Sequence, residues 1–267
     1  MALLTIRILD AEGTVKCTDS AEGFASLVFR GEYAPGDSIE VESSEKNIHL
    51  RLQLDDALGA EFVYMTDKIR YTVPFAEKRV NLSPKAFFGG DHYLYVRQLV
   101  EEEIYQYRNL AKNICDQREV QNLYPHATAN VETRGEAIFF ACNAIDGVCE
   151  NRSHGFWPYQ SWGINMRDDA EITVDFGRLI EADRIILFTR ADFPHDNWWT
   201  QVKVSFSDGS QIDWSLQDHY RFGQELTFEK KQIRWVRLSH LQKADDPSPF
   251  PALSQLEVYG RVVREEG

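Results

Sequence analysis

The chain is poor in basic residues and has no long apolar run, and both shortages exclude classes of function. It carries 29 Lys and Arg against 42 Asp and Glu, a formal net charge of -13. Nonspecific binding to nucleic acid or to anionic lipid needs basic side chains that neutralise phosphates, so neither nucleic acid nor a membrane surface is an expected partner. No segment is long and apolar enough to predict a membrane span. Neutral and cationic partners remain open.

The N-terminal stretch also lacks the features of an export signal. Its apolar run, MALLTIRIL, is short, is interrupted by Arg7 and is followed directly by Asp10. A secretory signal needs a longer uninterrupted apolar region. We therefore expect a cytoplasmic protein, or an extracellular one if a signal has been removed.

Cysteine is scarce and shows no functional spacing. The four cysteines form no CxxC pair and have no paired histidines at metal-binding spacing: Cys17, Cys115, Cys142 and Cys149. This pattern gives no support to a zinc site or a redox motif. We expect four free thiols.

Residues 1–99 have the pattern of β-strands. In residues 47–54 Ile48, Leu50, Leu52 and Leu54 alternate with polar residues, which is typical of a half-buried strand. Less regular runs separated by turn residues follow the same pattern: 5–9, 24–29, 38–41, 62–65, 69–73 and 93–99. We predict an antiparallel β-sandwich with an accessory or protein-interaction role.

The apolar period changes in residues 100–123. Val100, Ile104, Tyr107, Ala111 and Ile114 recur at intervals of three and four, which predicts one apolar helix face. Three glutamates at the start complement a helix dipole. We predict a short helical connector that packs on one or both flanking domains.

Residues 124–267 return to a β pattern with a different composition. All six tryptophans lie here and none lies in the first half. Strands are predicted at 170–176, 184–189, 201–207, 212–215, 225–228, 235–238 and 254–259, with a hairpin turn at 207–210. The expected fold is all-β, with two β-sandwich domains joined by the connector.

Five motifs in this second half stand in the order of a known family. They are NAIDG at 143–147, ITVDFG at 172–177, FSDG at 206–209, RWVRL at 234–238 and LSQLEVYG at 253–260. Over residues 124–261 the chain resembles the discoidin or F5/8 type C family, which overlaps with galactose-binding-like carbohydrate-binding modules. The resemblance implies an eight-stranded jelly roll, a structural calcium ion and a ligand site in the loops at one end.

The calcium ligands that the resemblance implies are the carboxylates of Asp146 and Glu257 and the backbone carbonyls of Asn143 and Ala252. Calcium takes six to eight oxygen ligands, including carbonyls, so this set is chemically reasonable. The chain departs from the family pattern at Val148 and Cys149, where a small polar residue is usual. Glu150 and Asn151 could supply the remaining ligands, and Asp146 could also be an ordinary turn residue.

The segment 190–199, RADFPHDNWW, follows the predicted strand at 184–189. Exposed aromatic rings beside basic and acidic groups suit a ligand with apolar faces and hydroxyl edges, which describes a carbohydrate. Arg190 matches the family's sugar-binding arginine, His195 replaces its asparagine, and Phe250 matches an aromatic in a late loop. The predicted ligand-binding residues are Arg190, His195, Trp198, Phe250, Trp157 and Asp196.

Other readings of these residues stay open. Arg190 could pair with Asp192 or Asp196 as a structural arrangement, and of the adjacent Trp198 and Trp199 at most one should face a ligand. His154 lies in a segment that could belong to a calcium loop, a sugar loop or neither. The same loops could instead bind another protein.

A glycan hydrolase is a further alternative. Asp192, Asp196, Asp245 and Asp246 offer carboxylates, but no catalytic motif selects a pair. We therefore expect a non-catalytic carbohydrate-binding protein.

Overall fold

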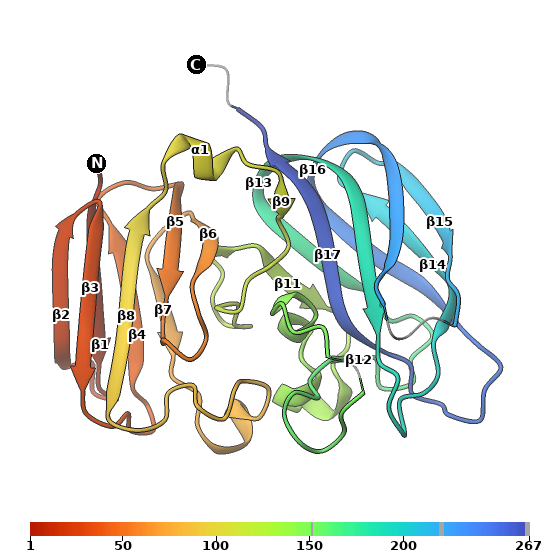
Figure 1. Ribbon diagram of the computed structural model, residues 1–267, viewed down its shortest axis with the longest axis horizontal. Helices are drawn as coiled ribbons and strands as arrows, with labels where there is room; N and C mark the ends of the chain where they lie inside the picture. Colours follow the sequence, from red (N-terminus) through yellow and green to blue (C-terminus); the bar gives the residue numbers. More distant parts are fainter. Residues whose placement is uncertain (151, 219–221, 265–267) are drawn as a thin grey trace.

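The computed structural model describes residues 1–150, 152–218 and 222–264. Within them the protein is all-β, as predicted: every strand pairing is antiparallel, and helical structure is confined to short turns. Figure 1 shows two β-units side by side, an N-terminal unit and a C-terminal unit. No helix among these residues is long and apolar enough to cross a membrane.

The N-terminal unit consists of two sheets that share one core. The first has the order β2 (Val15–Glu22), β1 (Leu3–Leu9), β4 (Ser38–Ser43), β7 (Ile69–Thr72). The second has the order β10 (Leu123–Tyr124), β6 (Glu61–Met65), β5 (Ile48–Gln53), β8 (Asp91–Gln98), β3 (Phe24–Arg30). The alternation noted at residues 47–54 buries Ile48, Leu50 and Leu52 on one face of β5. Hydrophobic burial of such faces holds the two sheets together.

Strand β2 was not predicted, because its sequence carries no apolar face. VKCTDSAE alternates between exposed and half-buried positions at the edge of the first sheet. A polar edge strand discourages pairing with another chain. Its hydrogen bonds to β1, and not burial, define it.

The C-terminal unit is built on one curved sheet. Its order is β12 (Trp162–Gly163), β17 (Ala252–Val262), β13 (Ile172–Thr189), β16 (Gln224–Lys243), β14 (Trp199–Phe206), β15 (Gln211–Ser215). Two further strands join it: β11 (His126–Ala129) pairs with β13, and β9 (Arg108–Asn109) pairs with β17. Each of the long strands β13 and β16 joins two of the predicted strands. Irregular pairing near Ala182 interrupts their register, and such bulges bend a strand so that it can serve both layers of a jelly roll.

The connector is not helical throughout, so the prediction of a helix that reaches Ile114 is wrong. Helix α1 covers only Glu101–Ile104. The chain then forms β9, and Asn109 and Asn113 use their side-chain oxygens to bind backbone amides of Ala111 and Cys115. Asparagine side chains that bind nearby backbone in this way compete with helix formation.

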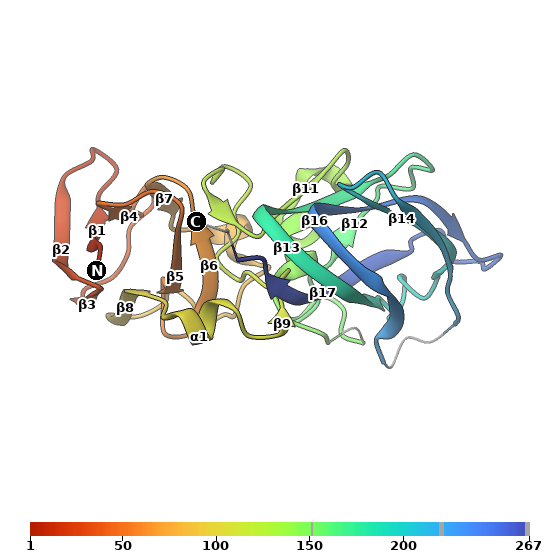
Figure 2. The same ribbon diagram turned by 90° about the horizontal axis from the view of Figure 1, so that it is seen from above.

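The connector packs against both units, as expected. Leu110 and Ala111 belong to the core of the C-terminal unit, whereas Cys115, Val120 and Leu123 belong to that of the N-terminal unit. The units also contact each other directly, since Asn81 donates to Asn143 at 2.8 Å. The N-terminal unit has one 3-10 helix, η1 (Ala76–Arg79), and the C-terminal unit has three: η2 (Thr133–Gly135), η3 (Ala137–Phe139) and η4 (Ala141–Ile145). Helix η1 contacts η3 across the two units. Figure 2 shows the connector between the two units.

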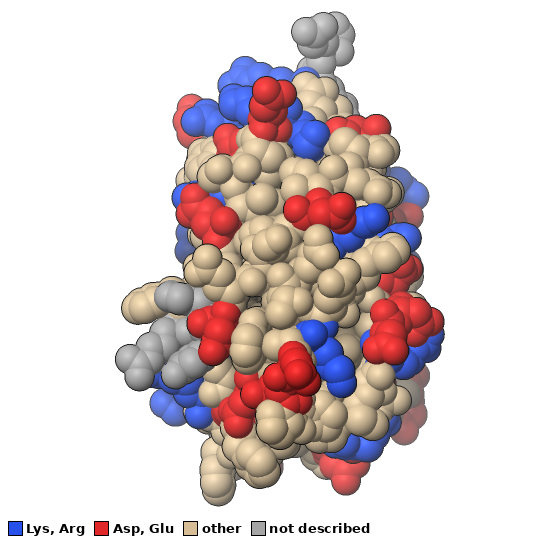
Figure 3. All heavy atoms as spheres, turned by 90° about the vertical axis from the view of Figure 1, so that its right-hand side faces the viewer, with Lys and Arg blue, Asp and Glu red and all other residues tan. Residues whose placement is uncertain are grey.

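Surface charge and cysteine chemistry fit the expectations from the sequence. On the outer face of the C-terminal unit, side chains of both signs are interspersed around an uncharged strip (Figure 3). All four cysteines are free thiols.

Candidate functional site

The predicted sugar loop connects β13 to β14, but its arginine is not at the surface. Phe193 is 81% exposed, as expected for a surface loop, whereas Arg190 is only 1% exposed. Trp199 is also buried and lies against Trp162 in the core, with ring centroids 6.4 Å apart. Trp198 is half-buried, so of the two tryptophans only Trp198 retains access to solvent.

Arg190 ties together two loops that are distant in sequence. Its Nε donates to Asp192 Oδ1 at 2.5 Å, its Nη2 donates to the Ser153 carbonyl at 2.7 Å, and its Nη1 donates to the Tyr159 carbonyl. The backbone N–H of Arg190 donates to the Ala252 carbonyl. The pairing with Asp192, left open by the sequence, is therefore formed. Arg190 acts as a buried brace, and a ligand cannot reach its guanidinium in this arrangement.

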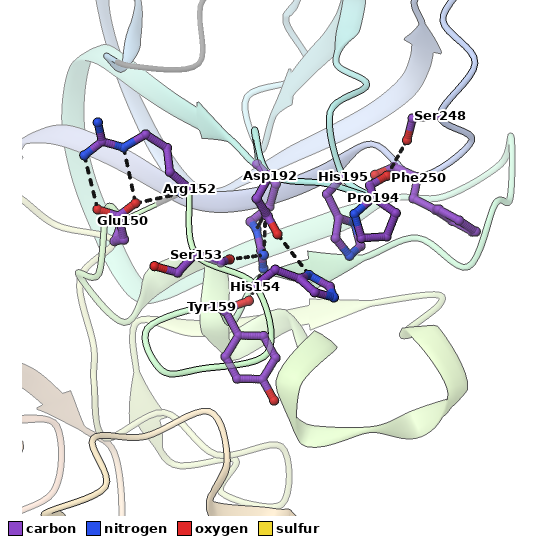
Figure 4. A network of polar contacts seen from close by, with 11 residues as sticks. Glu150, Arg152, Ser153, His154, Tyr159, Asp192, Pro194, His195, Ser248 and Phe250 are labelled. Carbon is purple, nitrogen blue, oxygen red and sulfur yellow. Dashed lines mark hydrogen bonds and ion pairs between the residues drawn. The ribbon is translucent and has the colours of Figure 1, made fainter.

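Asp192 connects the buried Arg190 to His154 at the surface. Its Oδ2 accepts a hydrogen bond from His154 Nδ1 at 2.9 Å, and the His154 side chain is 47% exposed. Figure 4 shows the chain from Arg190 through Asp192 to His154. A carboxylate that binds Nδ1–H fixes the tautomer and orientation of an imidazole. Within the described part of the chain Nε2 of His154 has no hydrogen-bond partner, so it is available to a ligand.

A second imidazole lies next to the first. The rings of His154 and His195 are 5.7 Å apart, and His195 Nδ1 lies 3.1 Å from the Phe250 carbonyl. Burial, with a smaller contribution from Arg190, lowers the pKa of His195. A neutral His195 that donates Nδ1–H to this carbonyl presents Nε2 as an acceptor. His195 is only 8% exposed, so Nε2 of His154 is the more accessible of the two nitrogens.

An aromatic ring borders the histidines. Phe250 is 37% exposed and its ring centroid lies 6.1 Å from that of His195. Asn197, which the sequence analysis missed, positions this late loop: it is fully buried and its Nδ2 donates to the Ser248 carbonyl at 2.7 Å. We define His154, His195 and Phe250 as the end-loop site.

The remaining predicted residues surround this site at the same loops. Trp157 is 38% exposed in the loop that also holds His154. Asp196 is exposed and forms no ion pair with any residue that the structure describes. The sequence signal for Asp192 and Asn197 was weak, because both act through hydrogen bonds to backbone or buried groups that no spacing reveals.

Hydrogen bonds within the protein engage three of the four groups expected to bind calcium: the carboxylates of Asp146 and Glu257 and the Ala252 carbonyl. Asp146 is buried, with Oδ1 accepting from Val148 N and Oδ2 from Gln160 Nε2, both at 2.7 Å. The Asn143 side chain binds Asn81, Ala137 and Ser161. The Ala252 carbonyl accepts from Arg190, and Glu257 accepts from the Tyr259 hydroxyl. Asn151 lies outside the described residues.

A lysine supplies positive charge at this place. The stem of Lys112 packs so closely on Gly147 that a Cβ there would overlap it, and Lys112 Nζ lies 2.7 Å from Glu61. Burial raises the pKa of Asp146 to about 7, while Gln160, Val148 and Lys112 oppose that rise. Burial also raises the pKa of Glu257, again opposed by Lys112 among others. Both Asp146 oxygens are engaged by protein donors and a lysine side chain packs on the adjacent Gly147, so this arrangement does not fit a calcium ion.

No protein-family model and no curated protein matches the chain, whereas several solved structures do. Among solved structures, it is similar to chitosan-binding module 1 from the chitosanase/glucanase of Paenibacillus sp. IK-5, at 21% identity over 57% of this chain and 99% of that one, with a TM-score of 0.41. It is similar to the lectin domain of lectinolysin complexed with Lewis B antigen, at 17% identity over 58% of this chain and 98% of that one, with a TM-score of 0.43. It is also similar to the family 32 carbohydrate-binding module of C. perfringens NanJ in complex with galactose, at 18% identity over 50% of this chain and 91% of that one, with a TM-score of 0.39.

Proposed function

We propose that the protein binds a neutral carbohydrate at the end-loop site, without catalysis. The observation that carries this proposal is an exposed imidazole, His154, held in one orientation by the buried Asp192 and Arg190. Orientation before binding lowers the entropy that a polar contact costs. Nε2 atoms of the two histidines can bind vicinal hydroxyls, while the Phe250 ring can cover the apolar C–H face of a pyranose.

The state of Asp192 supports binding rather than hydrolysis. Both of its oxygens are engaged, Oδ1 by Arg190 and Oδ2 by His154, and its side chain is only 4% exposed. A glycosidase needs two carboxylates that face the scissile bond from opposite sides. Because protein groups engage both Asp192 oxygens, neither is left to face a scissile bond.

The experiment is isothermal titration of the full chain with galactose, fucose and the Lewis b oligosaccharide, all of them neutral. A saturable heat with one sugar class is expected, with the affinity lowered about tenfold in His154→Ala and also lowered in Phe250→Ala. His240→Ala is the matched control, because His240 is an exposed histidine on β16 outside the site. No binding to any sugar, or binding that both site variants retain, would overturn the proposal.

Docking of another protein is the second candidate, favoured by one observation. Phe156 and Phe193 are 84% and 81% exposed in the two loops that flank the end-loop site. Exposed aromatic rings around a polar centre are common at protein interfaces. Phe156→Ser with Phe193→Ser distinguishes the two candidates: sugar binding should survive this double change, whereas protein docking should not.

A further inference from the structure

A groove of about 740 Å³ lies between the two units, next to the end-loop site. Its walls come from the N-terminal unit (residues 71–82), the connector (116–119) and the C-terminal unit (134–142 and Tyr159). Its volume is within the range of small-molecule pockets, about 300–1,000 Å³. Both units and the connector are therefore needed to form it.

Two aromatic residues join the groove to the end-loop site. Tyr159 lines the groove, and its ring centroid lies 6.3 Å from that of His154. The Tyr159 carbonyl accepts from Arg190, while its ring points away from that contact (Figure 4). On the other side, Phe139 lies 5.9 Å from His195 and 5.4 Å from the guanidinium of Arg134, which lines the groove. Tyr159 therefore borders both the groove and the end-loop site.

The chemistry of the groove suits an uncharged, hydroxyl-rich ligand. Tyr71, Leu82, Ile138 and Phe140 contribute apolar surface. The charged lining is nearly balanced, with Glu77, Asp116, Glu119 and Glu136 against Lys78, Arg118 and Arg134. Such a mixture gives no strong field for an ion of either sign.

Several of these charged groups are free to bind hydroxyls. Asp116 is committed to His126 at 2.6 Å, and Arg134 to Glu136 at 2.6 Å. By contrast, Glu77, Lys78 and Glu119 form no ion pair with any residue in the described ranges 1–150, 152–218 and 222–264. Carboxylates and ammonium groups on an apolar groove are the partners that sugar hydroxyls require.

We propose that this groove binds the following units of an oligosaccharide whose end unit occupies the end-loop site. The proposal rests on the proposed function and makes it more specific: the ligand is a neutral oligosaccharide rather than a single sugar. It also gives the N-terminal unit a role, because one wall of the groove belongs to it.

The test is titration calorimetry of the full chain with matched pairs of neutral probes: galactose and the Lewis b oligosaccharide, and fucose and the same oligosaccharide. For the pair that binds, the oligosaccharide should bind at least about tenfold tighter than its single sugar, because the groove adds contacts. Val80→Trp, at a 37% exposed position in the groove wall, should remove that advantage and leave single-sugar affinity unchanged. Val28→Trp is the matched control, since Val28 is 56% exposed on β3 and does not line the groove.

The outcomes separate this inference from the proposed function. Equal affinity for single sugar and oligosaccharide, or an oligosaccharide advantage that survives Val80→Trp, overturns the groove proposal and leaves the end-loop site standing. Absence of binding by every probe overturns both. Circular dichroism checks that Val80→Trp is folded. If it is not, Glu77→Lys, an exposed change in the same wall, should still lower oligosaccharide affinity selectively.

Discussion

Two of the histidine–aspartate pairs, His92 with Asp55 in the N-terminal unit and His154 with Asp192 in the C-terminal unit, differ in which ring nitrogens they leave unbound. In the N-terminal unit His92 is 2% exposed, with Nδ1 2.8 Å from Asp55 and Nε2 3.0 Å from the Gly89 carbonyl. In the C-terminal unit His154 is half exposed and only Nδ1 is engaged, by Asp192. The same residue types thus make a closed structural pair in one place and an open site in the other.

The surroundings of the two aspartates explain this difference. Asp55 also binds the backbone amides of Ala57 and Phe87, so its loop is held without any cation from another loop. Asp192 is held by Arg190, which at the same time fixes the 153 and 159 carbonyls. Although Asp55, Asp56 and His92 lie within 4.8 Å as a possible metal group, the His92 ring has no free nitrogen for an ion. A ligand can therefore reach a ring nitrogen of His154, whereas both ring nitrogens of His92 are engaged by the protein.

The largest expected effect is that of Arg190→Ala. It removes the brace and leaves Asp192 as a buried charge without its cation, which costs about 3–5 kcal/mol. We expect urea unfolding to show this loss of stability together with loss of sugar binding. A variant with wild-type stability would show that the open pair does not depend on Arg190.

His92→Ala should destabilise by about 3 kcal/mol, because it removes the partner of the buried Asp55. Sugar affinity should remain unchanged, since the closed pair offers no free atom to a ligand. Urea unfolding and sugar titration on the same preparation measure both quantities. A change in sugar affinity in the folded variant would show that the His92 pair also contributes to sugar binding.

His49 provides a pH test in the N-terminal unit. Burial, followed by Arg178 and Arg108, lowers its pKa from 6.5 to about 3. Between these values the unfolded chain binds a proton that the native state does not, so stability is complete above pH 6.5 and falls as the pH drops toward 3. From pH 7.5 to pH 5 the wild type should lose about 1–2 kcal/mol more than His49→Gln in urea unfolding. Equal losses would contradict the assigned shift.

His154→Ala should change affinity rather than stability. Asp192 keeps its bond to Arg190, and water can replace the half-exposed imidazole, so unfolding should change by no more than about 1 kcal/mol. Sugar affinity should fall about tenfold, which corresponds to about 1.4 kcal/mol. Titration of His240→Ala in parallel checks that loss of a surface histidine is not itself the cause.

The smallest expected effect is that of calcium. Because Lys112 and protein hydrogen bonds satisfy the expected ligands, a chelator and millimolar calcium should give the same melting temperature. A rise in melting temperature with calcium would show that Asp146 and Glu257 bind the ion after all.

Periodicity predicted strands well where one face is buried, as at β5, and failed where hydrogen bonds alone define the element, as at β2 and in the connector. The segment 190–199 follows a strand, as its sequence predicted. The burial of Arg190 was not predicted, because it depends on carbonyls of residues 153 and 159 that lie more than thirty positions away. His154 remained one alternative among three for the same reason.

The most direct test of the central claim follows the imidazole resonances by NMR while sugar is added to the full chain. The seven histidines of the sequence report on different parts of the molecule. The account predicts that a bound sugar shifts the resonances of His154 and His195 and leaves those of His92 and His126 in place. Saturable binding with His154 and His195 unmoved would contradict it and place the ligand elsewhere.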